Sequence, residues 1–257
     1  MIIYTPIPKF NITMITSPKC GCQTMDKITH RIFKHPFFLT YQCGVPSKSK
    51  DNLLKQRSLL DSLLQQISGH TIIASRHPVK RLLSCYNYMI LGQHHYPLYG
   101  GGKTWFKEPL EKVVGKPLRQ ITLTEFIDYI LQTPDNLRDI HFSTQSFLVE
   151  DINFDKIIKI ENFSQGLKDA ASLYNLPLVV PQHIQKNKTN YNLVKLNEIT
   201  SENLDKIHHI YKSDFNKFDH SKLSAKETIK YIKSKSLHGP VHQGPNAHKS
   251  RRWEKLQ

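Results

Sequence analysis

The fold of this chain is decided by the stretch Asn11-Ile12-Thr13-Met14-Ile15-Thr16-Ser17-Pro18-Lys19-Cys20-Gly21-Cys22-Gln23-Thr24. A short apolar run, typical of a strand, is followed at once by a turn that carries a lysine, a glycine, hydroxyl groups and amides. The backbone N–H groups of such a turn, with those of the first turn of a following helix, point at one place and carry partial positive charge. The stretch therefore predicts a binding site for a phosphate-type anion beside the Lys19 ammonium.

The order of residues in this turn differs from that of the phosphate-binding loop of nucleotide kinases. In that loop the lysine follows the second glycine and precedes a magnesium-holding Ser or Thr, whereas Lys19 comes before Gly21 and is followed by Cys20. A second glycine-rich segment, Gly100 to Thr104, follows no strand and has Pro97 where the motif needs its first glycine. A phosphate-type ligand is indicated, and a nucleotide kinase is a less favoured alternative.

A second strand end carries another group that can bind a phosphate. Thr71 to Ser75 is a short β-branched run, and it leads into Arg76-His77-Pro78-Val79-Lys80-Arg81-Leu82-Leu83-Ser84-Cys85-Tyr86. Pro78 suits the first position of a helix, so Arg76 is expected at a strand end and Ser84 about two turns into the helix. Arg76 can bind a phosphate through two parallel hydrogen bonds, and the Ser84 hydroxyl can donate another.

Together the two segments resemble the signatures of the sulfotransferases that use 3'-phosphoadenosine 5'-phosphosulfate (PAPS). The Lys19 turn is similar to the Pro-Lys-x-Gly-x-x-Thr-like loop that binds the 5'-phosphosulfate, and the Arg76 segment matches every fixed position of Arg-x-Pro-x-x-Arg-x-x-Ser-x-Tyr, which binds the 3'-phosphate. The resemblance implies that Lys19 is both catalytic and donor-binding. It implies further donor contacts from Cys20, Gly21, Cys22, Gln23, Thr24, Arg76 and Ser84.

Further blocks in the same order extend the resemblance to the carbohydrate sulfotransferases related to the chondroitin and dermatan enzymes. These blocks are residues 141–145, 154–161, 187–191 and 210–218, so that the resemblance covers roughly residues 11 to 218. It implies that Asn187, Lys188 and Thr189 contact the donor, that the acceptor is a hydroxyl group, preferably of a glycan or glycoconjugate, and that no metal is needed. The identity of the acceptor and the oligomeric state are not encoded in any pattern of the chain.

The acceptor hydroxyl must lose a proton during transfer, and histidine is the side chain whose ordinary pKa suits a general base near neutral pH. His141 opens the block His141-Phe142-Ser143-Thr144-Gln145, which resembles the His-Trp-x-Pro-Gln region of the family, and it is our candidate base. Asp26 and His30 are the alternatives. Glu161 is expected to be an orienting partner or a structural acid.

The alternation of strand and helix patterns predicts an α/β fold with a central parallel sheet flanked by helices, and the resemblance implies a P-loop-like three-layer sandwich. We expect one sulfotransferase domain over residues 1–235 and a basic, flexible tail over residues 236–257. Residues 92–117 are rich in Gly, His, Pro and aromatic residues and are expected to form a long surface loop. In parallel sheets ligands bind at the carboxyl ends of strands, where Lys19 and Arg76 both lie.

The charge of the chain fits an anionic ligand. A formal net charge of +15 and a pI near 9.6 produce a positive field that concentrates anions in any cleft. On charge alone a nucleic-acid-binding protein without catalysis is an equal alternative, but outside the stretch near Lys186 to Lys195 we find no basic segment interleaved with aromatic residues. We therefore expect no nucleic-acid partner.

Two further expectations concern location and metals. No apolar run approaches the length of about 18 residues that crosses a bilayer, and the N-terminus lacks the pattern of a secretory signal, so we expect a cytoplasmic enzyme without a transmembrane segment. The cysteines at 20, 22, 43 and 85 are too few and too scattered for a disulfide framework, and their spacing is not that of a zinc site. Reduced thiols and no structural metal are expected.

Overall fold

The computed structural model describes residues 2–21, 39–41, 69–91, 106–150, 152–176, 191 and 194–236. The strands are β1 (Ile2–Ile7), β2 (Ile12–Thr16), β3 (Leu39–Tyr41), β4 (His70–Ser75) and β5 (Lys156–Lys159). The helices are α3 (Pro78–Cys85), α4 (Lys107–Val114), α5 (Leu123–Gln132), α6 (Gln145–Leu148), α7 (Phe163–Tyr174), α8 (Ser201–Ile210), α9 (Lys212–Lys217) and α10 (Ala225–Ser236). A π-helical turn, η2 (Tyr86–Ile90), directly extends α3.

The described strands form one mixed sheet in the order β3-β1-β2-β4-β5. β2, β4 and β5 are parallel, with Ile15 opposite Ile73 and Ile73 opposite Ile157. The predicted parallel sheet is confirmed for these three strands. The buried, largely β-branched residues of β2 and β4 suit strands that are covered on both faces. It is wrong for β1, which runs antiparallel to both β2 and β3. A tight connection from Ile7 to Ile12 joins β1 to β2, and such a short link permits only antiparallel pairing.

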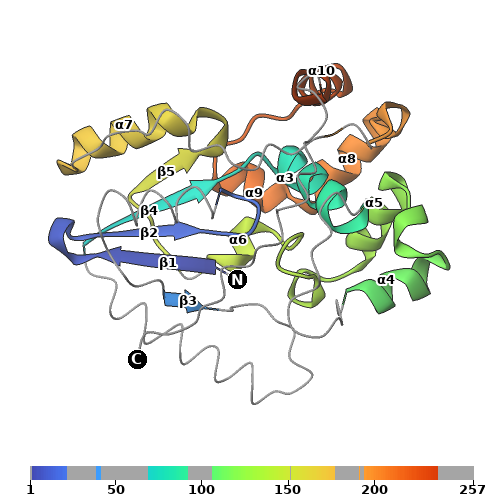
Figure 1. Ribbon diagram of the computed structural model, residues 1–257, viewed down its shortest axis with the longest axis horizontal. Helices are drawn as coiled ribbons and strands as arrows, with labels where there is room; N and C mark the ends of the chain where they lie inside the picture. The colour runs from blue at the N-terminus through green and yellow to red at the C-terminus, as the bar shows by residue number, and fades with distance from the viewer. Residues whose placement is uncertain are drawn as a thin grey trace, which may run out of the picture.

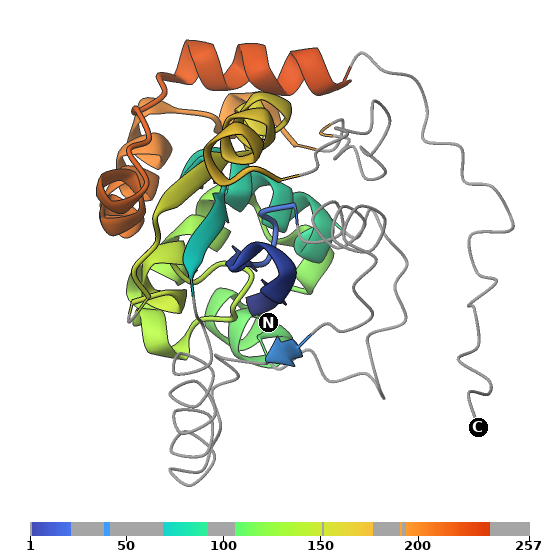
Figure 2. The ribbon, with the colours of Figure 1, turned by 90° about the vertical axis from the view of Figure 1, so that its left-hand side faces the viewer.

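Helices cover both faces of this sheet. On one face Ile72 and Ile158 pack against Leu167 of α7, and on the other Ile15 and Ile73 pack against Leu148 of α6 and Phe218 after α9. Figure 1 shows α7 along one side of the sheet, and α10 lies on the outside of the molecule in Figures 1 and 2. The described part of the chain thus has the predicted layers of helix, sheet and helix.

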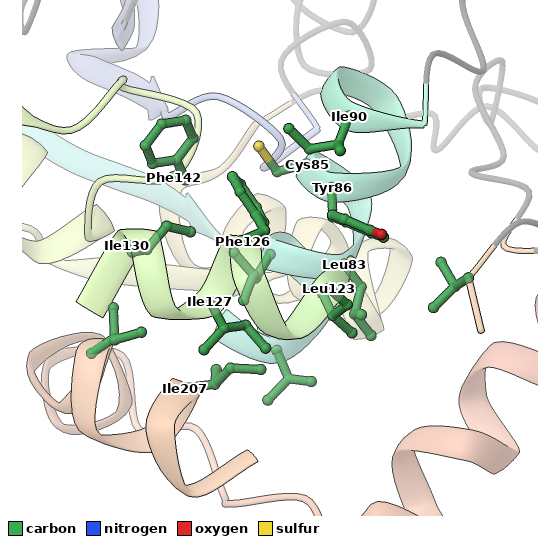
Figure 3. Close-up of a cluster of buried hydrophobic side chains, with 14 of the residues drawn as sticks. Leu83, Cys85, Tyr86, Ile90, Leu123, Phe126, Ile127, Ile130, Phe142 and Ile207 are labelled. Atoms are coloured by element: carbon green, nitrogen blue, oxygen red, sulfur yellow. The ribbon is translucent and has the colours of Figure 1, made fainter. Parts of the chain in front are cut away.

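A second body of helices lies beyond the carboxyl ends of β2 and β4 (Figure 1). Its core joins α3, α5 and α8 through fully buried side chains, shown in Figure 3, among them Leu83, Phe126, Ile127 and Ile207. The Thr122 hydroxyl accepts a hydrogen bond from the Glu125 N–H, and the Glu125 carboxylate accepts one from the Thr122 N–H, so a capping box begins α5. This packed body fixes α3, and with it the chain that follows Arg76.

Part of the predicted surface loop is helical. Residues Lys107–Val114 form α4, which ends at Gly115 with φ of 72°, and Leu110 is buried in the helical core. The apolar face of this helix is short and Pro109 lies in its first turn, where proline is tolerated, so the sequence gives little periodic signal. Among the described residues no helix is long and apolar enough to span a membrane. The predicted tail begins at residue 236, but Ser236 is the last residue of α10, and residues 237–257 lie outside the described residues.

Candidate functional site

The turn after β2 has the backbone geometry of an anion cradle. The Cys20 N–H donates to the Ser17 carbonyl at 3.1 Å, and both Lys19 (φ 65°) and Gly21 (φ 79°) adopt left-handed conformations. A lysine in this region costs conformational energy, and such residues cluster at functional sites. The left-handed φ of Gly21 favours glycine, and a Cβ atom here would lie 2.8 Å from Cδ1 of Ile160, whose side chain would have to shift.

Arg76 reaches this turn from the end of the neighbouring strand. Its Nη1 donates to the Lys19 carbonyl at 3.1 Å, and its Nη2 donates to the Tyr191 hydroxyl at 3.2 Å. Burial alone would lower the pKa of Arg76, but the surrounding tyrosines, Tyr191 and Tyr231, raise it above its ordinary value. Arg76 therefore stays cationic, and the structure brings Lys19 and Arg76 together as the sequence predicts.

The Gln145 amide joins the two strand ends. Its Nε2 donates to the Arg76 carbonyl at 2.8 Å, while its Oε1 accepts from the Arg76 N–H at 3.0 Å and from the Cys20 thiol at 2.7 Å. Asp214 in turn accepts the N–H groups of Gln145 at 2.9 Å and Ser146 at 2.7 Å. Burial raises the pKa of Asp214 although these N–H donors oppose the shift. Cys20 thus lies behind the cradle, where it supports the turn through its side chain.

Arg81 connects the cradle to the segment that carries His141. Its side chain is 1% exposed, and its Nε donates to the Pro18 carbonyl at 3.0 Å. Its two terminal nitrogens donate to the carbonyls of Ser143 at 2.6 Å and Ile140 at 3.0 Å. A buried guanidinium is stable when its fork of donors is satisfied in this way. One side chain therefore fixes the Lys19 turn and the His141 segment relative to each other.

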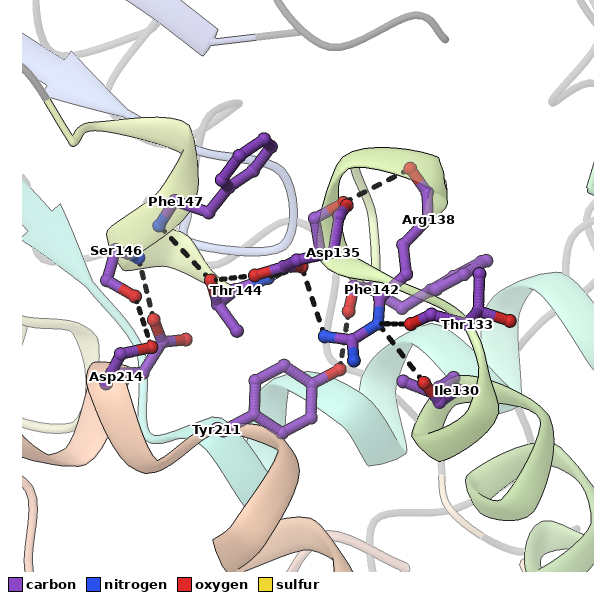
Figure 4. Close-up of polar contacts among 12 residues, drawn as sticks. Ile130, Thr133, Asp135, Arg138, Phe142, Thr144, Ser146, Phe147, Tyr211 and Asp214 are labelled. Carbon is purple, nitrogen blue, oxygen red and sulfur yellow. Dashed lines mark hydrogen bonds and ion pairs between the residues drawn. The ribbon is translucent and has the colours of Figure 1, made fainter.

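Further hydrogen bonds hold the segment around His141 (Figure 4). Arg138 Nε donates to the Thr133 carbonyl at 2.8 Å, and the Tyr211 hydroxyl donates to the Phe142 carbonyl at 2.6 Å. The Thr144 hydroxyl bonds to the Asp135 carboxylate and also caps α6 by accepting the Phe147 N–H. The segment is thus rigidly placed although it is not a regular helix or strand.

His141 is paired with Asp139. Its Nδ1 lies 2.6 Å from Asp139 Oδ1, and its backbone N–H donates to the same oxygen at 2.9 Å. Burial raises the pKa of Asp139, but the hydrogen bonds from His141 outweigh it, so this pKa lies below its ordinary value. An ionised Asp139 can only accept, so Nδ1 of a neutral His141 carries the proton and Nε2 is left as a base. The His141 side chain is 35% exposed, which gives an acceptor access to it.

The remaining residues of the predicted site lie either on other elements or outside the described residues. Ser84 lies on α3 and is 4% exposed, so a donor contact from its hydroxyl stays a prediction. Glu161 accepts the His77 N–H at 3.1 Å at the start of α3, as a structural acid would, and Asp139 lies beside His141 instead. The predicted donor contacts Cys22, Gln23, Thr24, Asn187, Lys188 and Thr189, and the alternative bases Asp26 and His30, lie outside the described residues.

Sequence reasoning left four supporting residues without a role: Arg81, Asp139, Gln145 and Tyr191. Arg81 and Gln145 were visible as fixed positions of the two quoted motifs. Asp139 lies two residues before His141, a spacing that could have indicated the pair. Tyr191 is 115 residues from Arg76 in sequence, and no local pattern reveals that contact.

A separate cavity of about 440 Å³ is not lined by Lys19 or Arg76. It is lined by His77, Lys80, Lys159, Glu161, Asp219, His220, Ser221 and Leu223. Its two ammonium groups are matched by two carboxylates, and Lys159 and Asp219 pair with each other at 3.2 Å. A balanced set of charges has little attraction for a polyanion. The Lys19 turn, with Arg76 beside it, is the better candidate for binding an anionic ligand.

Three buried or half-buried histidines, two of which line this cavity, predict that the fold loses stability in acid. Burial lowers the pKa values of His77 and His208, and burial with nearby Lys159 and Lys80 lowers that of His220 to about 3. Unfolded histidine takes up a proton near pH 6.5 and folded His220 does not, so the free energy of unfolding should fall from pH 6.5 toward pH 3. Each histidine contributes at most about 1.4 kcal/mol per pH unit, and less where it is partly exposed.

Urea unfolding at pH 7.5 and pH 5 measures this effect. His220→Asn should show a shallower pH dependence than the wild type, because one difference in proton uptake is removed. The exposed His209 on α8 provides the control His209→Asn, which should keep the wild-type slope. Equal slopes for His220→Asn and the wild type would show that His220 is not held neutral.

Comparison with known proteins gives one match. The family model described as "Sulfotransferase family" matches residues 5–221, which include the Lys19 turn, Arg76 and His141. No curated protein and no solved structure matches the chain.

Proposed function

The chain belongs to the sulfotransferase family, and we propose that it transfers the sulfuryl group of PAPS to an acceptor hydroxyl, with a carbohydrate as the preferred acceptor class. The observation that carries this proposal is the hydrogen bond from Arg76 Nη1 to the Lys19 carbonyl at 3.1 Å. It brings the Arg76 side chain onto the backbone of Lys19, so two cationic residues from the ends of adjacent parallel strands lie next to each other. PAPS carries anionic groups at both ends of one adenosine, and two adjacent cationic positions suit such a ligand.

The turn over residues 17–21 would hold the 5'-phosphosulfate in a P-loop-like manner. The left-handed conformations of Lys19 and Gly21 support this proposal, because consecutive N–H groups in such a turn form an anion-binding concavity. As the acceptor oxygen bonds to sulfur, the bond between sulfur and the bridging oxygen of the 5'-phosphate breaks. Negative charge then grows on the departing phosphate, and the Lys19 ammonium stabilises it.

Arg76 would bind the 3'-phosphate. Its guanidinium fork has five N–H donors, more than the contacts to Lys19 and Tyr191 use, and its raised pKa keeps it charged. His141 would take the proton of the acceptor hydroxyl on Nε2, because Asp139 holds the proton of the neutral ring on Nδ1. The ionised Asp139 then stabilises the imidazolium that forms. Arg81 fixes the His141 segment relative to the Lys19 turn through the contacts described above.

The binding role of Arg76 can be measured with the product nucleotide, 3'-phosphoadenosine 5'-phosphate (PAP). Arg76→Ala should raise the Kd for PAP about 10–100-fold, the range expected for loss of hydrogen bonds to a charged group. The Kd for 5'-AMP, which lacks the 3'-phosphate, should change little. Isothermal titration calorimetry with both nucleotides shows whether the loss of affinity depends on the 3'-phosphate. Arg119 is an exposed arginine, and Arg119→Ala should bind PAP as the wild type does.

To test the reaction itself, the protein is incubated with PAPS and a panel of hydroxylated acceptors. The masses of the products are then measured by mass spectrometry. Addition of a sulfuryl group to a glycan supports the full proposal, and addition to another alcohol keeps the activity but changes the acceptor class. Transfer of phosphate from ATP in the presence of magnesium would point to a kinase instead. Binding of long polyanions without saturable binding of PAP would point to a nucleic-acid-binding protein. A cytoplasmic location and independence from metals stay predictions.

A further inference from the structure

The geometry points to Tyr88 as the residue that positions the Lys19 ammonium for sulfuryl transfer. This inference rests on the proposed function and assigns a role to a residue that lies outside the matched motif positions. The Lys19 Nζ lies over the Tyr88 ring, 3.2 Å from its centroid. A cation so close to an aromatic face is attracted by the negative charge density of the ring.

The contact gives Lys19 a second fixed point. A lysine side chain is a flexible four-carbon stem and loses rotamer entropy when it is held in one place. Its backbone is already fixed, because Arg76 holds the Lys19 carbonyl and Arg81 holds the carbonyl of Pro18. Tyr88 holds the ammonium group at the far end of the Lys19 side chain. Arg76, Arg81 and Tyr88 all come from one continuous segment, between the end of β4 and the end of η2.

A rare backbone feature places the ring. Tyr88 lies in the π-helical turn Tyr86–Ile90, closed by the hydrogen bond from the Leu91 N–H to the Tyr86 carbonyl at 3.1 Å. Tyr86 and Ile90 are buried in the helical core (Figure 3), and the Tyr86 hydroxyl donates to the Ile121 carbonyl at 2.9 Å. Single π turns are frequently found at functional sites. Here the turn is anchored by its two ends while the half-buried Tyr88 between them meets Lys19.

The chemistry of the ring suits this role better than a carboxylate would. An Asp or Glu at the same place would bind the ammonium more strongly and would cancel the charge that the departing phosphate needs. A neutral ring favours the protonated amine and fixes its position, but leaves its positive charge to act on the donor. We therefore expect Tyr88 to influence the transfer step more than donor binding.

The test compares Tyr88→Leu, which removes the ring, with Tyr88→Phe, which keeps it. PAP release from PAPS is followed with the acceptor found in the screen, or with water as the acceptor. Tyr88→Leu should lower kcat about tenfold, the upper range for one cation–π contact, with little change in the Kd for PAP. Tyr88→Phe should keep most of the turnover. Tyr174 is an equally half-buried tyrosine on α7, and Tyr174→Leu should leave kcat unchanged.

A double-mutant cycle distinguishes a role through Lys19 from a general structural role. If Tyr88 acts through Lys19, then Tyr88→Leu should cause no further loss of kcat in the background of Lys19→Ala. Independent, multiplicative losses would overturn the inference. Equal kcat for Tyr88→Leu and the wild type would also overturn it.

A spectroscopic readout separates this inference from the proposed function. In protein whose lysines carry ¹³C-methyl labels, the Lys19 resonance should be shifted by the Tyr88 ring current in the wild type and in Tyr88→Phe, and this shift should vanish in Tyr88→Leu. Absence of the shift in the wild type overturns the contact even if PAPS is turned over. Presence of the shift without any turnover or PAP binding leaves the contact standing and overturns the proposed function.

Discussion

Replacing Lys19 by alanine should lower kcat for sulfuryl transfer about 10²–10³-fold, the loss seen when one preorganised group that stabilises transition-state charge is removed. Lys19 projects from the left-handed turn at the end of β2, and the ends of β2 and β4 are joined by Gln145 and Arg76. The effect should fall mainly on kcat, because charge on the departing phosphate is largest in the transition state. Steady-state rates with saturating PAPS measure it.

The matched control is Lys9→Ala. Lys9 is an exposed lysine whose ammonium also lies over an aromatic ring, that of Phe10, but it is remote from the strand ends that form the site. Its loss should leave kcat at the wild-type value. Circular dichroism of Lys19→Ala should match the wild type, because the backbone contacts of the turn to Arg76 and Arg81 remain. Near-normal turnover by a folded Lys19→Ala protein would remove Lys19 from the mechanism.

Replacing His141 by alanine should lower kcat about 10²–10⁴-fold, the usual contribution of a general base. The structure supports this role through Asp139, whose lowered pKa keeps it an acceptor and directs the lone pair of His141 to Nε2. The dependence of kcat on pH should differ between the wild type and His141→Ala, because the variant lacks the base. Rates measured across the pH range with saturating PAPS provide the comparison.

Two variants sharpen the assignment of the base. Asp139→Asn keeps the shape of the pair but can donate to Nδ1, which would move the proton of the ring to Nε2 and block the base. It should therefore lose most of the activity that His141→Ala loses. The exposed His209 gives the control His209→Ala, with unchanged rates expected. An active Asp139→Asn protein with a wild-type pH profile would exclude this dyad.

The parts of the fold that depend on local patterns were predictable from sequence. The β-branched run before Arg76 and the proline at 78 predict β4 and the start of α3. The meeting of Lys19 and Arg76 was also predictable, because carboxyl ends of adjacent parallel strands share one edge of a sheet. β1 was missed, since Pro6 within Ile2–Ile7 weakens a strand pattern.

The residues that support the site could not be assigned from local patterns, because their partners are distant in sequence. Gln145 contacts Cys20 across 125 residues, and Arg81 contacts Pro18 across 63. The role of Tyr88 depends on a π turn, and no propensity distinguishes a π turn from an α turn in the sequence Tyr86 to Ile90. Such contacts follow from tertiary packing, which sequence reasoning reaches only through the topology of the whole sheet.

A crystal structure of the protein with bound PAP tests the central claim most directly. We predict that the 5'-phosphate lies on the turn after β2 within contact of Lys19, and that the 3'-phosphate of the same molecule contacts Arg76. A nucleotide bound elsewhere, or one that reaches only one of these two side chains, would contradict the account.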